Sequence, residues 1–365
     1  MDLTGVSIAG RVQAVAVGEL SASACALVSD GTVQCWGDDD FEELGSIAGP
    51  CPDSATGAST CSQTPVEVPG VNDAAAIATG GQFACALSAG GVLSCWGAND
   101  MGALGTSVPL GSVSGPVQVA TGVAGIAVGH ETACGQMADM SWKCWGADLS
   151  QVGASGTPPA SPQGWDPDID GAITVGFGGV TFFGCALWPD GSVRCFGILP
   201  WSTDTTPVYP PAVVAGLPPL TQMAVGADFV CGVTVAGQTV CWGNNGEDQI
   251  GVAASPTPLP PTVVPGVDGA VQVAVGAVLG GFACDLLNDG TVECWGRHFT
   301  GIPGSAGLRP VLGDSYACSE SNLESDPCSA PVPIGGVLGV TQIAAGVGTC
   351  ALKADGTVEC WGLSI

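Results

Sequence analysis

CALVSDGTVQCWG, residues 25–37, decides the fold, because it holds two cysteines ten residues apart around a turn sequence. A three-residue hairpin loop is a type I turn followed by a residue in the left-handed region, usually glycine. With residues 29–31 as that loop, Cys25 lies directly opposite Cys35 in a non-hydrogen-bonded pair. The Cα atoms of such a pair are about 4.5 Å apart, which a disulfide can bridge. The spacing therefore predicts a β-hairpin closed by a disulfide.

All 18 cysteines fall into pairs with this spacing. The predicted disulfides join Cys25 to Cys35, Cys51 to Cys61, Cys85 to Cys95, Cys134 to Cys144, Cys185 to Cys195, Cys231 to Cys241, Cys284 to Cys294, Cys318 to Cys328 and Cys350 to Cys360. Zinc is the alternative, but zinc ligands usually follow Cys-x(2–4)-Cys, and His130 and His298 lie outside any such spacing. We therefore predict disulfides, and disulfides in this number are typical of an oxidising compartment.

Seven of the pairs share the frame of the opening stretch. These predicted hairpins span residues 25–35, 85–95, 134–144, 185–195, 231–241, 284–294 and 350–360. Six of them carry glycine at the left-handed position. The hairpin at 134–144 has Met140 there instead, so we expect a different or wider turn at that point.

The frame recurs along the whole chain as a repeat. Each unit has an apolar strand ending in Gly, the cysteine hairpin ending in Trp-Gly, a variable loop often holding Leu-Gly or Ile-Gly, and a short edge strand such as PVEVPG. Seven units of about four strands predict an all-β, seven-bladed β-propeller spanning residues 1–365 as a single domain. The seventh unit lacks an edge strand, and Val6–Ile8 matches one. We therefore expect this N-terminal strand to pair with the last blade and close the ring.

At these residues the sequence resembles the regulator of chromosome condensation repeat family. The pattern VAxG…CALxxDGxVxCWGxNxxGxLG…PVxVxG covers nearly the whole chain, and the Cys-Ala-Leu…Cys-Trp-Gly form is similar to that of the secreted bacterial branch. The resemblance implies a seven-bladed propeller. The family's nuclear founder is a nucleotide exchanger for a small GTPase and binds chromatin, whereas another member is a secreted inhibitor that binds β-lactamases through one face. A propeller scaffold by itself specifies no activity.

The charge balance narrows the range of partners. Lys and Arg together number 6 and Asp and Glu 33, so the net charge is -27. Nucleic acid and anionic membrane surfaces are disfavoured because phosphate binding needs clustered Lys and Arg. Disulfides and this charge also argue against the roles of the nuclear founder. The sequence has no apolar run of about 18 residues, so no membrane span is predicted. A basic protein partner fits better.

Two long loops are the predicted recognition surface. The insertions at residues 46–64 and 299–330 each contain a cysteine pair, and they follow units one and six. Both should project from the same face of a closed ring. Long loops are often functional, and the alternative is insertion drift with protective crosslinks. The aromatic residues predicted to contact a partner are Trp165, Trp201, Tyr209 and Tyr316. The tryptophans of the repeat frame are instead predicted to pack between blades.

Candidate metal ligands and catalytic groups are sparse. The calcium candidates are Asp166, Asp168, Asp170, Asp314, Glu320, Glu324 and Asp326. The segment DPDIDG lacks the glutamate that a calcium loop has at its twelfth position, where Phe177 stands, so we expect no cofactor and keep calcium as the alternative. No nucleophile elbow or phosphate loop occurs, and His130 has the place of a turn residue.

The sequence thus predicts a non-enzymatic module, secreted, periplasmic or on a bacterial cell surface, that binds a protein partner through one face of the propeller. The first alternative is a structural cell-surface protein whose rings self-associate. The second alternative is a carbohydrate-active or lyase-type enzyme on the same scaffold.

Overall fold

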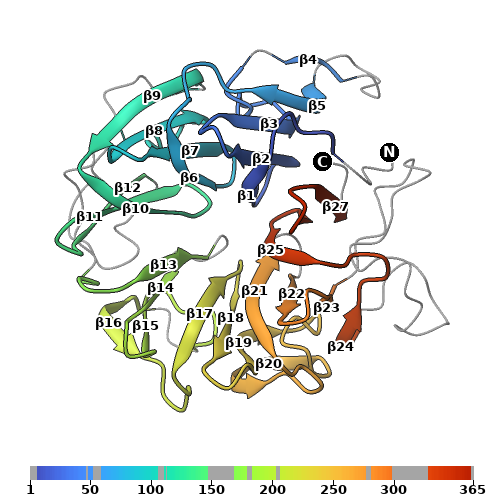
Figure 1. The fold of residues 1–365 in the computed structure, drawn as a ribbon. Coiled ribbons are helices and arrows are strands. Elements are labelled where there is room, and N and C mark those ends of the chain that lie inside the picture. Colours follow the sequence, from blue (N-terminus) through green and yellow to red (C-terminus); the bar gives the residue numbers. More distant parts are fainter. Residues whose placement is uncertain are drawn as a thin grey trace.

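The computed structural model describes residues 6–46, 48–51, 59–105, 111, 113–146, 168–178, 183–202, 206–276, 281–297 and 328–362, and all regular secondary structure in these segments is β-strand. They form seven antiparallel sheets, which we number blades 1 to 7 in chain order (Figure 1). No helix in the described segments is long and apolar enough to cross a membrane.

The strands of each blade follow one another across its sheet in chain order, except that β4 lies outside β5 in blade 1. Blades 1 and 2 contain β1 (Val12–Val17), β2 (Ser23–Val28), β3 (Val33–Asp38), β5 (Thr60–Glu67) and β4 (Gly49–Pro50), then β6 (Ala74–Thr79), β7 (Phe83–Ser88), β8 (Val92–Gly97) and β9 (Val113–Thr121). Blades 3 and 4 contain β10 (Val123–Val128), β11 (Thr132–Met137) and β12 (Trp142–Gly146), then β13 (Thr174–Phe177), β14 (Phe183–Leu187), β15 (Val193–Gly197) and β16 (Val208–Val213). Blades 5 to 7 contain β17 (Leu220–Val225), β18 (Phe229–Thr234), β19 (Thr239–Asn245) and β20 (Ser255–Val263), then β21 (Ala270–Gly276), β22 (Phe282–Leu287), β23 (Val292–Gly296) and β24 (Cys328–Pro333), then β25 (Val340–Ala345), β26 (Gly348–Lys353) and β27 (Val358–Gly362).

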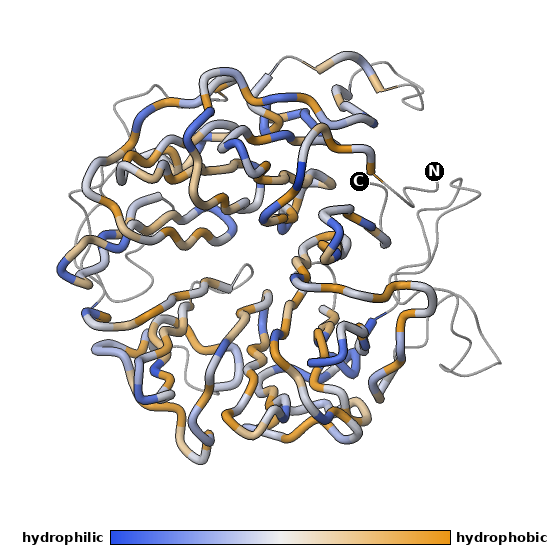
Figure 2. The backbone as a smooth tube through the Cα atoms, viewed as in Figure 1, coloured by the Kyte–Doolittle hydropathy of each residue, from blue (hydrophilic) through white to orange (hydrophobic). Residues whose placement is uncertain are grey.

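The first strand of each blade lies innermost. Neighbouring first strands contact each other around the ring, and β1 contacts β25 as well as β6, so blade 7 lies beside blade 1 (Figure 1). Hydrophobic positions are spread through every blade (Figure 2), and each buried cluster lies within or between neighbouring blades. The all-β seven-bladed propeller predicted from the repeat is therefore the observed fold.

The cysteine hairpins have the register that the spacing predicts. Cys25 pairs with Cys35 across β2 and β3, their Cα atoms are 4.1 Å apart, and a disulfide joins them. Gly31 closes the turn with a φ of +85°.

Every other predicted disulfide that lies within the described segments is also formed. In the frame of the repeat, disulfides join Cys85 to Cys95, Cys134 to Cys144, Cys185 to Cys195, Cys231 to Cys241, Cys284 to Cys294 and Cys350 to Cys360. Outside the frame, Cys51 is joined to Cys61. The predicted pair of Cys318 and Cys328 depends on residues outside the described segments. The hairpin interpretation of the ten-residue spacing is thus confirmed for all seven framed pairs.

The expectation of a different turn at Met140 is wrong. Met140 takes the left-handed conformation itself, with a φ of +68°, and its N–H donates to the Met137 carbonyl at 2.9 Å. Gly31 makes the equivalent bond to Val28, also at 2.9 Å. Strand register and the Cys134–Cys144 pair evidently impose the same turn on a non-glycine residue, at the steric cost of the left-handed region.

Three blades are joined to the next by a glutamine clamp. The Gln222 amide accepts from the Val273 N–H at 2.9 Å and donates to the Val273 carbonyl at 3.0 Å. Gln272 makes the same two bonds to Ile343, and Gln342 makes them to Val15. The last of these clamps joins blade 7 to blade 1.

The N-terminal segment lies between blades 7 and 1. Val6 forms one antiparallel bridge with Val358, and its N–H donates to the Val358 carbonyl at 3.3 Å. Ala9 exchanges two hydrogen bonds with the Gln34 side-chain amide. Val6 and Ile8 also pack against the apolar cluster that blades 7 and 1 share. The structure thus has a bridge here, and complete closure of the ring by strand pairing stays a prediction.

The Leu-Gly motif explains how a loop seats on the next blade. Gly45 has a φ of +69°, and a Cβ added there would lie 2.8 Å from the indole of Trp96 in blade 2. Gly105 and Gly251 approach Trp145 and Trp295 in the same way. Glycine is required at this position by both conformation and space.

Gly45→Ala should therefore destabilise the protein by about 1–3 kcal/mol, because it combines left-handed strain with a contact against a buried indole. Urea unfolding followed by tryptophan fluorescence would measure the change. Gly70→Ala is the matched control, since Gly70 also has a positive φ, of +83°, but has open space where a Cβ would lie. Equal effects of the two substitutions would contradict the packing explanation.

Candidate functional site

Strand order places two sets of loops on one face of the ring. Each blade's first strand runs toward this face and its second away from it, so the loops between strands one and two and between strands three and four both lie there. We call this the loop face. The hairpin turns and the links between blades lie on the opposite side, the turn face. Backbone bonds join the two sets of loops, as from Asp38 N–H to the Ala22 carbonyl at 3.0 Å.

The loops between strands three and four rest on the next blade's tryptophan. The Trp96 indole donates to the Glu43 carbonyl at 2.9 Å, and the Trp145 indole donates to the Ala103 carbonyl at 2.9 Å. The Trp295 indole donates to the Gln249 carbonyl at 3.0 Å. These indoles are fully buried. The prediction that framed tryptophans pack between blades is confirmed for them.

The insertion between β3 and β5 of blade 1 is anchored to neighbouring acidic residues. Strand β4 pairs with β5, and Cys51 is joined to Cys61 at their ends. Thr60 N–H donates to the Asp40 carboxylate at 2.7 Å, and the Thr60 hydroxyl donates to the Asp39 carbonyl at 2.8 Å. The described part of this insertion, residues 48–51 and 59–64, therefore stands on the loop face as a disulfide-braced ribbon.

The loop face is strongly acidic. Its described carboxylates are Glu19, Asp38, Asp39, Asp40, Glu42, Glu43, Asp100, Glu131, Asp228, Glu247 and Asp248. Arg297 is the one Lys or Arg among the described residues of this face, and its guanidinium lies 3.5 Å from the Glu247 carboxylate. Burial lowers the pKa of His130, which favours the neutral imidazole. The face therefore attracts positive charge.

Unpaired buried polar atoms gather at the same face. In the described segments, all but one of the buried side-chain nitrogen and oxygen atoms without a hydrogen-bond partner belong to residues in or beside these loops, and the exception is Asp285 Oδ1. They are Glu19 Oε2, Trp36 Nε1, Glu43 Oε1, His130 Nδ1, Trp242 Nε1, Asp248 Oδ1, Gln249 Nε2 and Trp361 Nε1. Buried polar atoms are normally paired, so an unpaired group indicates a function or a missing partner.

The aspartates of the turn face present a contrast. In five hairpin turns the aspartate accepts from the backbone N–H two residues later, as in Thr32 N–H to Asp30 at 3.0 Å. The other four are Asp139, Asp190, Asp289 and Asp355. Hydrogen bonds from the Thr or Ser side chain and backbone lower the pKa of each aspartate. These carboxylates are explained by turn structure.

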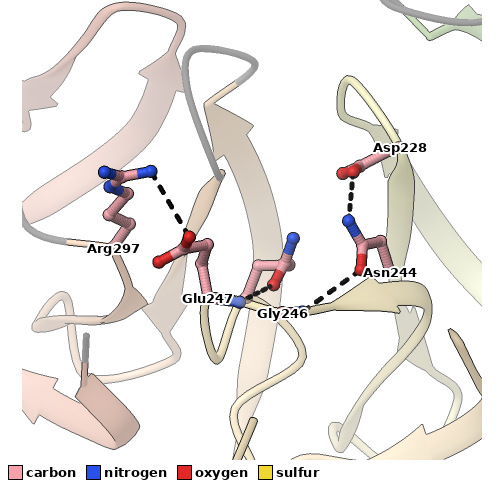
Figure 3. A network of polar contacts seen from close by, with 6 residues as sticks. Asp228, Asn244, Gly246, Glu247 and Arg297 are labelled. Carbon is pink, nitrogen blue, oxygen red and sulfur yellow. Dashed lines mark hydrogen bonds and ion pairs between the residues drawn. The ribbon is translucent and has the colours of Figure 1, made fainter. Parts of the chain in front are cut away.

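Blades 5 and 6 are linked on the loop face by a chain of polar contacts (Figure 3). The Asn244 amide donates to the Asp228 carboxylate at 2.5 Å and accepts from Gly246 N–H at 3.2 Å. Glu247 N–H donates to Gln249 Oε1 at 2.9 Å, and the Glu247 carboxylate reaches Arg297 of blade 6. This network fixes the blade 5 loop against its neighbour.

Of the predicted aromatic contacts, the structure describes Trp201 and Tyr209. Trp201 is half-buried and packs edge-on against Phe183, with ring centroids 5.3 Å apart, so it anchors its own loop. Tyr209 is exposed, and its hydroxyl donates to the Asp168 carboxylate at 3.4 Å. Trp165 and Tyr316 lie outside the described residues. The aromatic set as a partner surface stays a prediction.

The calcium candidates fall into two groups. Asp166, Asp314, Glu320, Glu324 and Asp326 lie outside the described residues. Asp170 instead accepts from Trp142 N–H at 3.3 Å, which ties the link to the hairpin of blade 3. In the part of the chain that the structure describes, no group of three or more His, Cys, Asp or Glu side chains is arranged to hold a metal ion. Calcium therefore stays a prediction.

Comparison with known proteins bears on the fold. Residues 74–103, which run from the inner strand of blade 2 to its loop, match the family model of the regulator of chromosome condensation (RCC1) repeat. Prp20p of Saccharomyces cerevisiae is 16% identical over 96% of this chain and 82% of its own, with a TM-score of 0.69. Human WBSCR16 is 17% identical over 97% and 88%, with a TM-score of 0.68.

A plant receptor has a similar fold. The ectodomain of the Arabidopsis thaliana receptor kinase ACR4 is 18% identical over 98% of this chain and 97% of its own, with a TM-score of 0.54. At these identities the solved structures bear on fold alone. Residues 74–103 therefore match an RCC1 repeat by sequence, and the chain as a whole has the propeller fold that the sequence resemblance implies.

Proposed function

We propose that this chain is a non-enzymatic binding module that engages a protein partner through its loop face. The observation that carries the proposal is the concentration of carboxylates on that face, where Arg297 is the one described Lys or Arg. The aspartates of the hairpin turns, by contrast, are satisfied within the fold. Carboxylates that no cation of the chain compensates are groups that a bound protein can pair with.

Similar structures fit an interaction role. Prp20p binds Gsp1p and histones, and Prp20 forms a complex with Kap60. These partners belong to Prp20. What we carry over is the use of a propeller of this kind as a platform for protein binding.

We further propose that the module works outside the cytoplasm, secreted, periplasmic or at a bacterial cell surface. Eight disulfides among the described cysteines fit an oxidising compartment. Two of the similar structures are receptor ectodomains. This placement restricts the partner to extracytoplasmic proteins.

Site-specific photocrosslinking would test the choice of face. A benzophenone amino acid replaces Asp40 on the loop face or, as the matched control, Asp190 on the turn face, since both side chains are exposed. Each variant is incubated with the extracytoplasmic fraction of the source cells. We expect one foreign protein to crosslink at residue 40 in stoichiometric yield and not at residue 190. Crosslinks only between copies of the chain would favour the self-assembling alternative and contradict the proposal.

A further inference from the structure

Three loops of the loop face share one backbone arrangement but differ in charge. In each loop, the backbone N–H of a Leu or Ile donates to a side-chain oxygen of the residue five positions earlier, at 2.9–3.0 Å. In blades 2 and 5 that oxygen belongs to an amide, on Asn99 and Asn245. In blade 1 it belongs to the carboxylate of Asp39. An amide oxygen therefore suffices for this bond, although Asp39 also uses its second oxygen, which accepts from Ala48 N–H at 3.1 Å.

The same exchange occurs four residues later. In blade 5, Gln249 Oε1 accepts from Glu247 N–H at 2.9 Å. In blade 1, Glu43 Oε2 accepts from Phe41 N–H at 2.8 Å. Asp38 likewise takes the place of Asn244. Blade 1 thus has three acids where blade 5 has three amides, within the segment Asp38–Glu43, which we call the acidic loop.

The acids of this loop are energetically unfavourable in their environment. Glu43 is 2% exposed, its Oε1 is unpaired, and burial, followed by the charges of Asp38 and Asp39, raises its pKa to about 8. Burial also raises the pKa of Asp38 and of Asp39. Amides in place of Asp38 and Glu43 would keep the hydrogen bonds of these two side chains without this desolvation and repulsion. Asp39 differs, because its Oδ1 accepts from Leu44 N–H and its Oδ2 accepts from Ala48 N–H. At Asp38 and Glu43 the fold therefore gains nothing from an acid in place of an amide.

No cation of the described segments compensates for the acidic loop. None of the ion pairs between described residues involves it, and Arg297 on the same face pairs with Glu247 of blade 5. The loop also lies at the base of the braced ribbon formed by residues 48–51 and 59–64, because Thr60 bonds to Asp39 and Asp40. Its exposed and half-buried carboxylates are thus held in fixed positions beside a protruding element.

From these observations we infer that the acidic loop is the contact point for lysine or arginine side chains of the protein partner. This inference rests on the proposed function and deepens it by naming the partner's chemistry and the blade that recognises it. A cationic side chain docked here would meet Asp38, Asp40 and Glu42 at the surface, with Asp39 and the unpaired Glu43 oxygen behind them. Electrostatic complementarity of this kind selects partners and speeds their association.

An internal amide variant tests the inference. Asp38→Asn/Asp39→Asn/Glu43→Gln copies the blade 5 residues into blade 1. It keeps the oxygens that accept from the N–H groups of Asp40, Phe41 and Leu44, and it gives up the bond from Ala48 N–H to Asp39 Oδ2. The matched control, Asp30→Asn/Asp190→Asn/Asp355→Asn, replaces the same number of carboxyl groups in hairpin turns whose bonds an asparagine oxygen can also accept. Both variants should fold, as circular dichroism and thermal melting would verify.

Binding of hexalysine at low ionic strength is the first readout, by isothermal titration calorimetry. We expect the amide variant to bind about tenfold more weakly than the unmodified chain, and the control to change by less than about twofold. The difference should shrink in about 0.5 M salt, because screening weakens contacts between exposed charges. Equal losses in the two variants, or no loss in the amide variant, would overturn the inference.

The crosslink at residue 40 separates this inference from the proposed function. If the amide variant captures the same foreign protein with undiminished yield, the loop face binds a partner but the acidic loop does not select its charge, and the inference fails alone. If neither form captures a protein there, both fail. Capture that is lost in the amide variant and retained in the control supports both.

Discussion

The double variant Thr239→Val/Asp285→Ala should be more stable than the unmodified chain at pH 8, by about 2–5 kcal/mol. Asp285 is fully buried, and the Thr239 hydroxyl donates to it at 2.8 Å. Other blades have apolar residues at both positions, such as Val33 and Ala26 in blade 1. Replacing a buried polar pair by well-packed apolar residues is often neutral or stabilising.

The stability gain should depend on pH in a defined direction. Burial raises the pKa of Asp285 to about 8, well above its value of about 3.9 in an unfolded chain. Between these values the folded state holds a proton that the unfolded state has lost, so the unmodified chain loses stability as pH rises from about 4 to about 8. The double variant lacks this contribution, and its advantage should therefore be small at pH 4 and largest at pH 8.

Urea unfolding at pH 4, 6 and 8, with the disulfides intact, would measure both effects. Thr239→Val alone is the informative control, because it leaves the carboxyl of Asp285 without its one hydrogen bond and should destabilise the protein. If the free energy of unfolding depends on pH in the same way in the double variant and in the unmodified chain, Asp285 titrates normally and the prediction is wrong.

The second large effect is expected from removal of the N-terminal segment. A chain beginning at Gly10 loses the Val6–Val358 bridge, the two bonds between Ala9 and Gln34, and the packing of Val6 and Ile8. We expect a loss of about 2–4 kcal/mol from apolar burial and hydrogen bonding together. The unpaired edge of β27 should also make the shortened chain prone to aggregation.

Thermal melting and light scattering would test this prediction. Gln222→Ala is the matched control, because it removes a clamp between blades 5 and 6 without exposing a sheet edge. The control should lower stability by about 1 kcal/mol and leave the chain monodisperse. If the shortened chain melts like the intact one and stays monodisperse, the N-terminal strand does not close the ring.

Local chemistry made much of the fold predictable. The ten-residue cysteine spacing requires an antiparallel hairpin with one register, and the observed pairs Cys25–Cys35 and Ala26–Gln34 follow from it. At Met140 the same reasoning fails, because turn propensity is a preference of about 1–2 kcal/mol that strand pairing and a disulfide can outweigh. The usual preference for glycine at this turn position was therefore a poor guide at Met140, because strand pairing and the disulfide determine the turn more strongly.

The candidate site was only partly predictable. The sequence indicates an acidic protein with loops on one face, and it contains the signal that was missed. WGDDDFEELG differs from WGNNGEDQIG by acids at three positions where the latter has amides. Without coordinates, nothing shows that the two loops use these oxygens for the same bonds. For the aromatic candidates, the sequence could not show that Trp201 packs against Phe183, because that contact joins the loop after β15 to the start of β14.

The sequence by itself determined the repeat, the strand pairing within each hairpin and the charge of the protein, because these depend on residues close in the chain. Only the tertiary structure decided which polar atoms remain unpaired. Asp30 and Glu43 are both acids in loops, but Thr32 satisfies the first, whereas the second is buried beside Asp38 and Asp39 with one oxygen unpaired. The Asp30–Thr32 bond is local to its turn, whereas the burial of Glu43 arises only when the blade 1 loop packs in the folded ring, and burial of that kind cannot be derived from neighbouring residues in the sequence.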